Sequence, residues 1–348
     1  METQNYLPLV NVFRGPVLEC IHYGAIAVCE PSGRLVFSYG NVDGSMYLRS
    51  TAKPIQVLPF VEMGGVEHFG LTERELAILC ASHSGTDEHA ETVAGIQRKI
   101  GVTEKDLMCG VHPPYHEPTA ARMKANHEPL SENRHNCSGK HTGMLAQAML
   151  RGVSTDNYID PNHPVQQLII KTFSEMTGSP VDEIKLGVDG CSAPVFAVPL
   201  WRSAYAMARL ADPSGLPEAR ANACRKIFHA MAANPDMVAG PDRFDTLVMQ
   251  VAGGKLIAKA GAEGFQGIAV LPGALWSGSP ALGIAYKISD GDHGQRARPT
   301  VGTEILRQLG VLDDIELKQM AAYDARPQYN WRKVEVGRIE PAFLLQQC

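Results

Sequence analysis

Ser50 and Lys53 stand three residues apart in the stretch 48–54, and a proline follows the lysine. A serine hydroxyl is a weak nucleophile until a base takes its proton. On a helix, a lysine at this spacing lies on the same face as the serine, one turn away. Burial lowers the pKa of a lysine, and a neutral amine is then a suitable base. The same spacing arises by chance, so a helix start with a solvated lysine is the competing interpretation.

Two later motifs suit the same chemistry. The triplet Ser82-His83-Ser84 follows the first motif, and Lys259-Ala260-Gly261 comes late, behind an apolar run. Penicillin-recognising serine hydrolases combine Ser-x-x-Lys with a second Ser-containing triplet and a late Lys-x-Gly. Here the triplet ends in Ser where their pattern has Asn. The comparison therefore favours a Ser/Lys acyl-transfer site and speaks against β-lactam chemistry.

Two glycine-bearing turns each carry a cysteine, Cys137 and Cys191. Two thiolates with one nitrogen or oxygen ligand bind zinc, with Zn–S bonds of about 2.3 Å. The ligand spacings of zinc fingers are absent, so spacing alone also fits two free turn cysteines. Zinc and free thiols both remain open at this point.

These motifs need strands and helices to position them. Strands are expected at 17–28, 35–39, 255–260, 267–271, 282–288 and 334–339, and helices at 50–63, 72–79, 87–100, 141–151, 165–176, 200–210, 218–232 and 300–309. Residues 110–135, rich in Pro, His and Asn, are expected to be irregular. The pattern predicts an α+β chain that forms a single compact catalytic unit. Its mainly antiparallel sheet comes from about 1–60 and 250–348, is covered by helices, and has a mostly helical insertion over about 61–249.

Net charge and composition limit the classes of partner and the cellular location that we expect. A net charge of -5 gives no reason to expect nucleic acid or an anionic membrane. No run of 18 apolar residues occurs, so no membrane span is expected. The first five residues, METQN, have neither the basic region nor the apolar core of a signal peptide. Eight cysteines without an export signal favour reduced thiols or metal ligands, and we expect a cytoplasmic protein.

Six stretches together resemble the rhizobial-type, or class 3, L-asparaginases of the asparaginase II family. They are RSTAKPIQ at 49–56, CASHSG at 80–85, NCSGKHTG at 136–143, DGCSAP at 189–194, KAGAEG at 259–264 and AYKISDG at 285–291. Their occurrence in this order, over nearly the whole chain, is specific. The resemblance implies a fold related to serine β-lactamases and glutaminases, and hydrolysis of L-asparagine to L-aspartate and ammonia.

The resemblance also implies roles for individual residues. The family's two catalytic Ser-Lys pairs map onto Ser50 with Lys53 and onto Ser82 with Lys259. Its zinc site maps onto Cys137, Lys140 and Cys191, where the ion positions substrate and does not generate the nucleophile. A lysine ligand must be neutral, so metal binding would depend on pH. The family's tendency toward homodimers implies a homodimer here.

Substrate contacts are expected at three further residues. Arg49 offers a bidentate fork for the substrate α-carboxylate, or is a surface arginine before a helix. Asp189 suits the α-ammonium group, or closes an Asp-Gly turn. His83 is included because it lies inside the serine triplet. The identity of the attacking serine and the preference for asparagine over glutamine stay open. The rival functions are a penicillin-binding-type serine peptidase or esterase, and a non-catalytic zinc-binding protein of the same fold.

Overall fold

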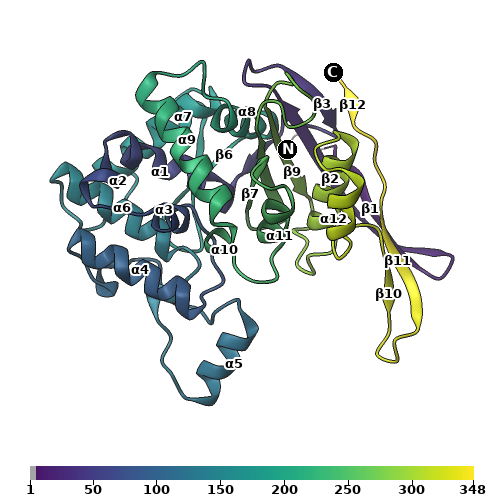
Figure 1. The fold of residues 1–348 in the computed structure, drawn as a ribbon, viewed down its shortest axis with the longest axis horizontal. Coiled ribbons are helices and arrows are strands. Elements are labelled where there is room, and N and C mark those ends of the chain that lie inside the picture. The colour runs from purple at the N-terminus through teal and green to yellow at the C-terminus, as the bar shows by residue number, and fades with distance from the viewer. Residues whose placement is uncertain (1–4) are drawn as a thin grey trace. The chain divides into compact units, whose positions relative to one another are not determined.

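The computed structural model describes residues 5–348 (Figure 1). By their contacts these residues divide into two compact units. Unit 1 comprises the described part of Met1–Thr51 with Val198–Asp212 and Leu247–Cys348. Unit 2 comprises Ala52–Ala197 and Pro213–Thr246. Residues 1–4, which belong to the segment used to argue against a signal peptide, lie outside the described residues. That the whole chain works as one catalytic unit stays a prediction.

A nine-stranded antiparallel sheet is the centre of unit 1. Its strands are β1 (Leu7–Arg14), β2 (Val17–Cys29), β3 (Leu35–Tyr39), β7 (Leu256–Ala260), β8 (Phe265–Val270), β9 (Leu282–Ile288), β10 (Arg326–Tyr329), β11 (Glu335–Pro341) and β12 (Gln346–Gln347). The main order is β10-β11-β1-β2-β9-β8-β7, and β3 pairs with both β2 and β12. The prediction of an α+β chain with a mainly antiparallel sheet is therefore confirmed.

Helices cover both faces of this sheet. The unit also contains β4 (Ser45–Tyr47), α8 (Leu200–Ala211), α12 (Ala297–Gln308) and α13 (Asp314–Gln319). Gly283 of β9 faces α8, where an added Cβ would lie 1.9 Å from the Ala204 carbonyl oxygen. Tyr286 points to the opposite face of the same strand, and its hydroxyl donates to the Arg298 carbonyl of α12 at 2.8 Å. Burial on both faces explains why β9 is almost continuously apolar.

Unit 2 is mainly helical. Its helices are α1 (Lys53–Glu62), α2 (Gly65–His68), α3 (Glu73–Leu79), α4 (Asp87–Ile100), α5 (Glu117–Ala125), α6 (Ser138–Arg151), α7 (Pro164–Thr177), α9 (Glu218–Ala233) and α10 (Pro235–Val238), with 3-10 turns at Glu104–Asp106, Glu132–Arg134 and Val181–Glu183. Helix α6 packs against α3 through Gly139, where a Cβ would lie 2.0 Å from the Ile78 carbonyl oxygen. Strand β5 (Lys185–Val188) pairs with β6 (Pro194–Pro199).

The chain passes from one unit to the other four times. Three of these boundaries lie within elements, namely the 3-10 turn Arg49–Ala52, strand β6 and helix α11 (Phe244–Val251), and the fourth lies between Asp212 and Pro213. The 3-10 turn runs directly into α1, so Ser50 and Lys53 stand on consecutive helical turns. Within residues 5–348, no helix combines the length and the apolar character needed to cross a membrane.

The structure corrects one expectation about secondary structure. Residues 110–135 are not irregular throughout, because α5 (Glu117–Ala125) lies within them. A proline in its first turn suits a helix start. The ring of His116, just before the helix, bonds the Thr119 hydroxyl at 2.8 Å. The high proline content that suggested a loop is in part the signal of a helix beginning.

Candidate active site

Lys53 is the first residue of α1, and only 1% of it is exposed. Its Nζ donates to the Ser82 hydroxyl oxygen at 2.9 Å, to the Ala81 carbonyl at 2.6 Å and to the Asn136 carbonyl at 3.2 Å. Three donors on three acceptors are the full complement of an ammonium group. These three protein oxygens therefore compensate for the hydration that the ammonium group loses on burial.

Ser82 lies in the loop that follows α3. Its backbone N–H donates to the Val238 carbonyl at 2.9 Å, and only 7% of the residue is exposed. The resemblance paired Lys53 with Ser50 and Ser82 with Lys259, and both pairings stay predictions. The Lys53–Ser82 bond joins the two motifs directly, and motif spacing gave no sign of it.

His83 is fully buried beside this serine. The Gly85 N–H donates to its Nδ1 at 3.2 Å, so Nε2 carries the ring proton and bonds the Ser138 hydroxyl oxygen at 2.8 Å. The Ser138 hydroxyl in turn donates to the Asn133 carbonyl at 2.9 Å. Burial, and then the charges of His89 and Lys53, hold the pKa of His83 well below its ordinary value. We expect this neutral ring to fix the loop of Ser82, and its predicted contact with substrate stays a prediction.

The cysteine motifs meet inside unit 2. Cys137 precedes α6, Lys140 lies in the first turn of α6, and the turn after β5 contributes Cys191. All three are buried, and Lys140 Nζ donates to Cys191 Sγ at 2.9 Å. The hydrogen bond with Cys191 holds the pKa of Cys137 far below that of a free thiol, against the opposing effect of burial. Burial disfavours the charge of Lys140, but the two sulfurs outweigh it and raise the pKa of that amine.

This cluster can be tested for its fit to zinc. No group of three or more His, Cys, Asp or Glu residues in the described part of the chain is arranged to hold a metal. The predicted set contains only two such residues, and its third member is a lysine. Near it, His141 bonds the Tyr158 hydroxyl through Nδ1 at 2.7 Å, while its buried Nε2 has no hydrogen-bond partner within residues 5–348. Two sulfurs, an amine and an orphaned nitrogen fit a zinc ion, so the site at Cys137, Lys140 and Cys191 stays a prediction that this chemistry permits.

In unit 1, the segment that carries Ser50 packs on the hairpin of β7 and β8. The Thr51 hydroxyl donates to the Lys259 carbonyl at 3.0 Å. A Cβ on Gly261 would lie 2.5 Å from the Leu48 carbonyl oxygen, and one on Gly267 would lie 2.6 Å from Thr51 Cγ2. Lys259 itself is buried, and its Nζ donates to the Ala260 carbonyl at 2.8 Å. The Lys-x-Gly spacing therefore has a physical reason, because glycine is needed where the serine segment meets this hairpin.

Arg49 and Glu263 belong to these same two segments. Both have left-handed backbones, with φ of 50° and 57°, which long side chains rarely adopt and which concentrate at functional sites. Arg49 Nη1 lies 3.9 Å from Glu263 Oε1. Glu263 lies inside one of the stretches used for the family resemblance, and nothing in the sequence indicates its left-handed backbone.

Asp189 forms the turn between β5 and β6. Its Oδ1 accepts from the Gly190 N–H at 2.8 Å, and its carbonyl accepts from the Ser192 N–H at 2.9 Å. These bonds are those of the Asp-Gly turn that was the competing interpretation of this residue. Asp189 also contributes to the raised pKa of Lys140. Its predicted contact with the substrate ammonium group stays a prediction.

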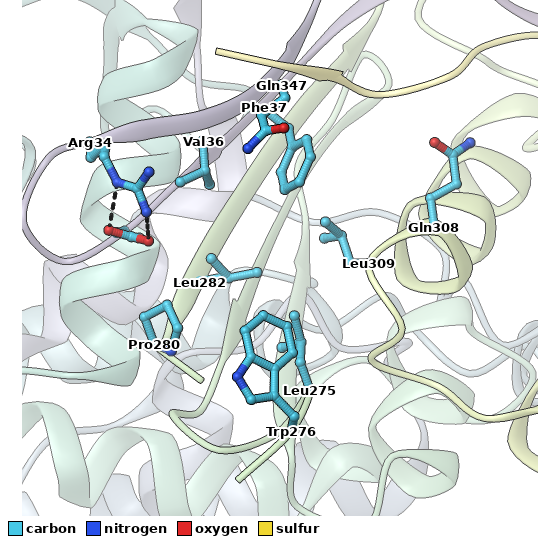
Figure 2. A pocket seen from close by; sticks show the side chains of 11 residues that line it. Arg34, Val36, Phe37, Leu275, Trp276, Pro280, Leu282, Gln308, Leu309 and Gln347 are labelled. Carbon is cyan, nitrogen blue, oxygen red and sulfur yellow. Dashed lines mark hydrogen bonds and ion pairs between the residues drawn. The ribbon is translucent and has the colours of Figure 1, made fainter. Parts of the chain in front are cut away.

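A cavity of about 400 Å³ in unit 1 contains none of these residues (Figure 2). It is mainly apolar, and Phe37, Leu275 and Trp276 are among the side chains that line it. At its edge Arg34 is paired with Glu30, with Nε 3.0 Å from Oε2. No group there is arranged for nucleophilic attack, so the candidate chemistry lies with the Ser and Lys residues.

Comparisons with known proteins include two solved glutaminases. A Bacillus glutaminase shares 13% identity over 83% of this chain and 91% of its own, with a TM-score of 0.38. A probable glutaminase from Bacillus subtilis, complexed with 6-diazo-5-oxo-L-norleucine, shares 12% identity over 83% of this chain and 85% of its own, also with a TM-score of 0.38. No curated protein matches the chain.

A family model matches most of the chain. The family model described as L-asparaginase II matches residues 10–341. This match includes every stretch on which the resemblance was based, and it confirms that resemblance. The chain belongs to the L-asparaginase II family of amidohydrolases.

Proposed function

We propose that this protein hydrolyses the side-chain amide of L-asparagine, giving L-aspartate and ammonia through a Ser/Lys covalent mechanism. The carrying observation is the buried bond between Lys53 Nζ and Ser82 Oγ at 2.9 Å. It joins two of the four proposed catalytic residues in a dry environment, where proton transfer between amine and hydroxyl is effective. Membership of an amidohydrolase family supports the same reaction class.

In the proposed mechanism, Ser50 is the nucleophile and Lys53 is its base. Lys53 first gives up one proton to water by way of the Ser82 hydroxyl, because an ammonium group whose three N–H groups all donate has no lone pair to offer. It then takes the proton of Ser50 while the serine oxygen bonds to the amide carbon. Backbone N–H groups at this helix start stabilise the oxyanion. The C–N bond breaks as the leaving nitrogen receives that proton from Lys53, and ammonia departs. Water then hydrolyses the acyl-enzyme ester, which frees Ser50 and releases L-aspartate.

Ser82 and Lys259 have supporting roles in this proposal. Ser82 is hydrogen-bonded to Lys53 and relays protons to and from it. Lys259 supplies a second amine for the attack of water. Cys137, Lys140 and Cys191 would hold a zinc ion, whose chemistry would be to orient and polarise the substrate. Arg49, His83 and Asp189 remain the proposed substrate contacts.

We also propose a cytoplasmic homodimer, on the strength of the composition and of the family resemblance. The proposed reaction depends neither on the cellular location nor on the oligomeric state. Size-exclusion chromatography with light scattering tests the dimer directly, and a mass of one chain at micromolar concentration would refute it.

The direct test is ammonia release from L-asparagine and from L-glutamine by the purified protein. Ser50→Ala and Ser82→Ala are compared with Ser32→Ala, because Ser32 is an exposed serine outside the site. We expect both amides to be assayable, asparagine to be preferred, and only Ser32→Ala to match the wild type. Absence of ammonia from L-asparagine would refute the proposal. Turnover of nitrocefin would point to penicillin-type chemistry, and zinc binding without any turnover would point to a non-catalytic protein.

A further inference from the structure

The ring of His112 is bonded to the backbone beside the proposed base. His112 lies in the loop before α5, and its Nδ1 is 2.6 Å from the Pro113 carbonyl oxygen. A carbonyl oxygen only accepts, so Nδ1 carries the ring proton in this contact. Nε2 is then bare, and it accepts the Asn136 N–H at 3.1 Å. One imidazole therefore ties Asn136 to the loop that contains Pro113.

The neighbouring rings limit the movement of this imidazole. It stacks on Tyr115, with ring centroids 4.6 Å apart and an interplanar angle of 17°, and the centroid of the His135 ring lies 4.4 Å away at 57°. His135 is buried, and its own Nδ1 accepts the Cys137 N–H at 3.0 Å. Two consecutive backbone N–H groups, those of Asn136 and Cys137, thus end on bare nitrogens of two rings that are in contact. This arrangement fixes the short segment that carries them.

The same segment supplies one of the oxygens that hold Lys53. The Asn136 carbonyl accepts from Lys53 Nζ at 3.2 Å, and it belongs to the same peptide group as the Cys137 N–H. A chain of hydrogen bonds therefore runs from the amine through this peptide to the His135 ring, and bonds in such a chain strengthen one another. The His112 ring holds the other side of Asn136, so the two rings together set where this carbonyl oxygen lies.

The position of this oxygen affects the direction in which the amine points. The Asn136 and Ala81 carbonyls only accept, so each keeps one N–H of Lys53 when the amine is neutral. The remaining position, which is the lone pair, then faces the hydroxyl of Ser82, the proposed relay, 2.9 Å from Nζ. The bond to Asn136 is the longest of the three, so a small displacement breaks it first. Without this bond the amine is free to rotate, and its lone pair turns away from the proposed path of the proton.

We propose that His112, together with His135, is a positioning residue for the general base, because it holds the Asn136 carbonyl in place and thereby aims the Lys53 amine at Ser82. This inference rests on the proposed function and deepens it. His112 acts through Asn136 and needs no contact with the substrate. Its loss should therefore slow the chemical step and leave substrate binding almost unchanged.

The kinetic test compares two replacements of His112. Leucine has no side-chain atom that forms hydrogen bonds, whereas the side-chain oxygen of glutamine accepts an N–H as the imidazole does. Because a misplacement of about 1 Å costs about a hundredfold in rate, we expect His112→Leu to lower kcat for L-asparagine by about 10- to 100-fold and to change KM by less than about twofold. His112→Gln should recover most of this loss. His229→Leu, which removes an exposed histidine of α9, is the matched control, and circular dichroism checks the fold.

A second measurement locates the ring proton without any turnover. In isotope-labelled wild-type protein, nitrogen NMR distinguishes a protonated from a bare ring nitrogen, and an N–H···N hydrogen bond gives a nitrogen–nitrogen coupling. We expect a protonated Nδ1 on His112, a bare Nε2, and a coupling from Nε2 to the Asn136 backbone nitrogen. The alternative is a protonated Nε2 that donates to the Asn136 side-chain oxygen, which lies 3.4 Å away.

The outcomes separate this inference from the function on which it rests. An unchanged kcat in a folded His112→Leu enzyme would overturn it, as would an equal loss in His112→Gln, which would mean that the ring only fills space. A raised KM with an unchanged kcat would make His112 a substrate contact instead. A protonated Nε2 in the wild type would overturn the inference whatever the variants show. A wild type that releases no ammonia from L-asparagine would refute the proposed function, whereas any of the former results in an active enzyme refutes only the positioning role.

Discussion

Replacing Lys53 by Met removes the amine that joins the two serine motifs and keeps most of the side-chain volume. A positioned general base contributes about 10²- to 10⁴-fold to a rate, so we expect kcat to fall by at least about a hundredfold. The effect on the free energy of unfolding is the sum of two opposing contributions. Three acceptors lose their donor, at about 1–3 kcal/mol each. The variant no longer buries an ammonium group, which otherwise costs several kcal/mol.

These opposing contributions are of similar size, so the Lys53→Met protein should stay folded with a small change in melting temperature. The assay is ammonia release from L-asparagine, with circular dichroism and thermal unfolding on the same samples. Lys105→Met, which removes an exposed lysine, is the matched control. Lys53→Ala with added propylamine separates the chemistry from the packing, because rescue that follows the free-amine concentration identifies a base. A folded Lys53→Met enzyme with more than about a tenth of the wild-type kcat would refute the assignment.

Four further results are expected. Ser50→Ala should lose several orders of magnitude in kcat while Ser82→Ala keeps measurable activity, and the reverse order would make Ser82 the nucleophile. The rate of the wild type should rise with pH into the alkaline range, since a lysine base must be deprotonated, and a flat profile would exclude such a base. Chelation should raise KM more than it lowers kcat, with zinc content measured in parallel on the Cys137→Ala, Cys191→Ala double mutant. Because the pKa of His83 is depressed below its ordinary 6.5, its contribution to stability is complete above that pH and lost as the pH falls below it, so His83→Gln should flatten acid unfolding below pH 6.5.

Local signals in the sequence predicted local structure well. The capping box at Thr72 places the start of α3, as Thr72 accepts from the Glu75 N–H and Glu75 reaches back to the Thr72 N–H. The apolar run of β9 was found because a strand buried on both faces has few polar residues. Strand β1 was missed, although it pairs with β2 and β11, because its proline and asparagine disguise the alternation.

The contacts of the candidate site were harder to predict because they join residues far apart in the chain. Lys53 and Ser82 are 29 positions apart, and the Thr51 hydroxyl meets the Lys259 carbonyl across 208 positions. Residue types and motif order indicated which residues matter. They did not indicate that Lys53 bonds Ser82. Nor did they indicate that the segment carrying Ser50 can approach Gly261 only because this residue has no side chain. Such pairings depend on tertiary packing, which no local spacing records.

The order of strands in unit 1 has a consequence for the timing of activity during protein synthesis. Strand β1 lies between β2 and β11, and β2 pairs with β9, so the sheet joins segments that leave the ribosome far apart in time. Contacts of such long sequence separation form slowly and only after both partners exist. Ser50 therefore emerges long before the hairpin that carries Lys259 and Glu263. A nascent chain would hold an unassembled serine motif, and hydrolysis would begin only once translation had passed β9.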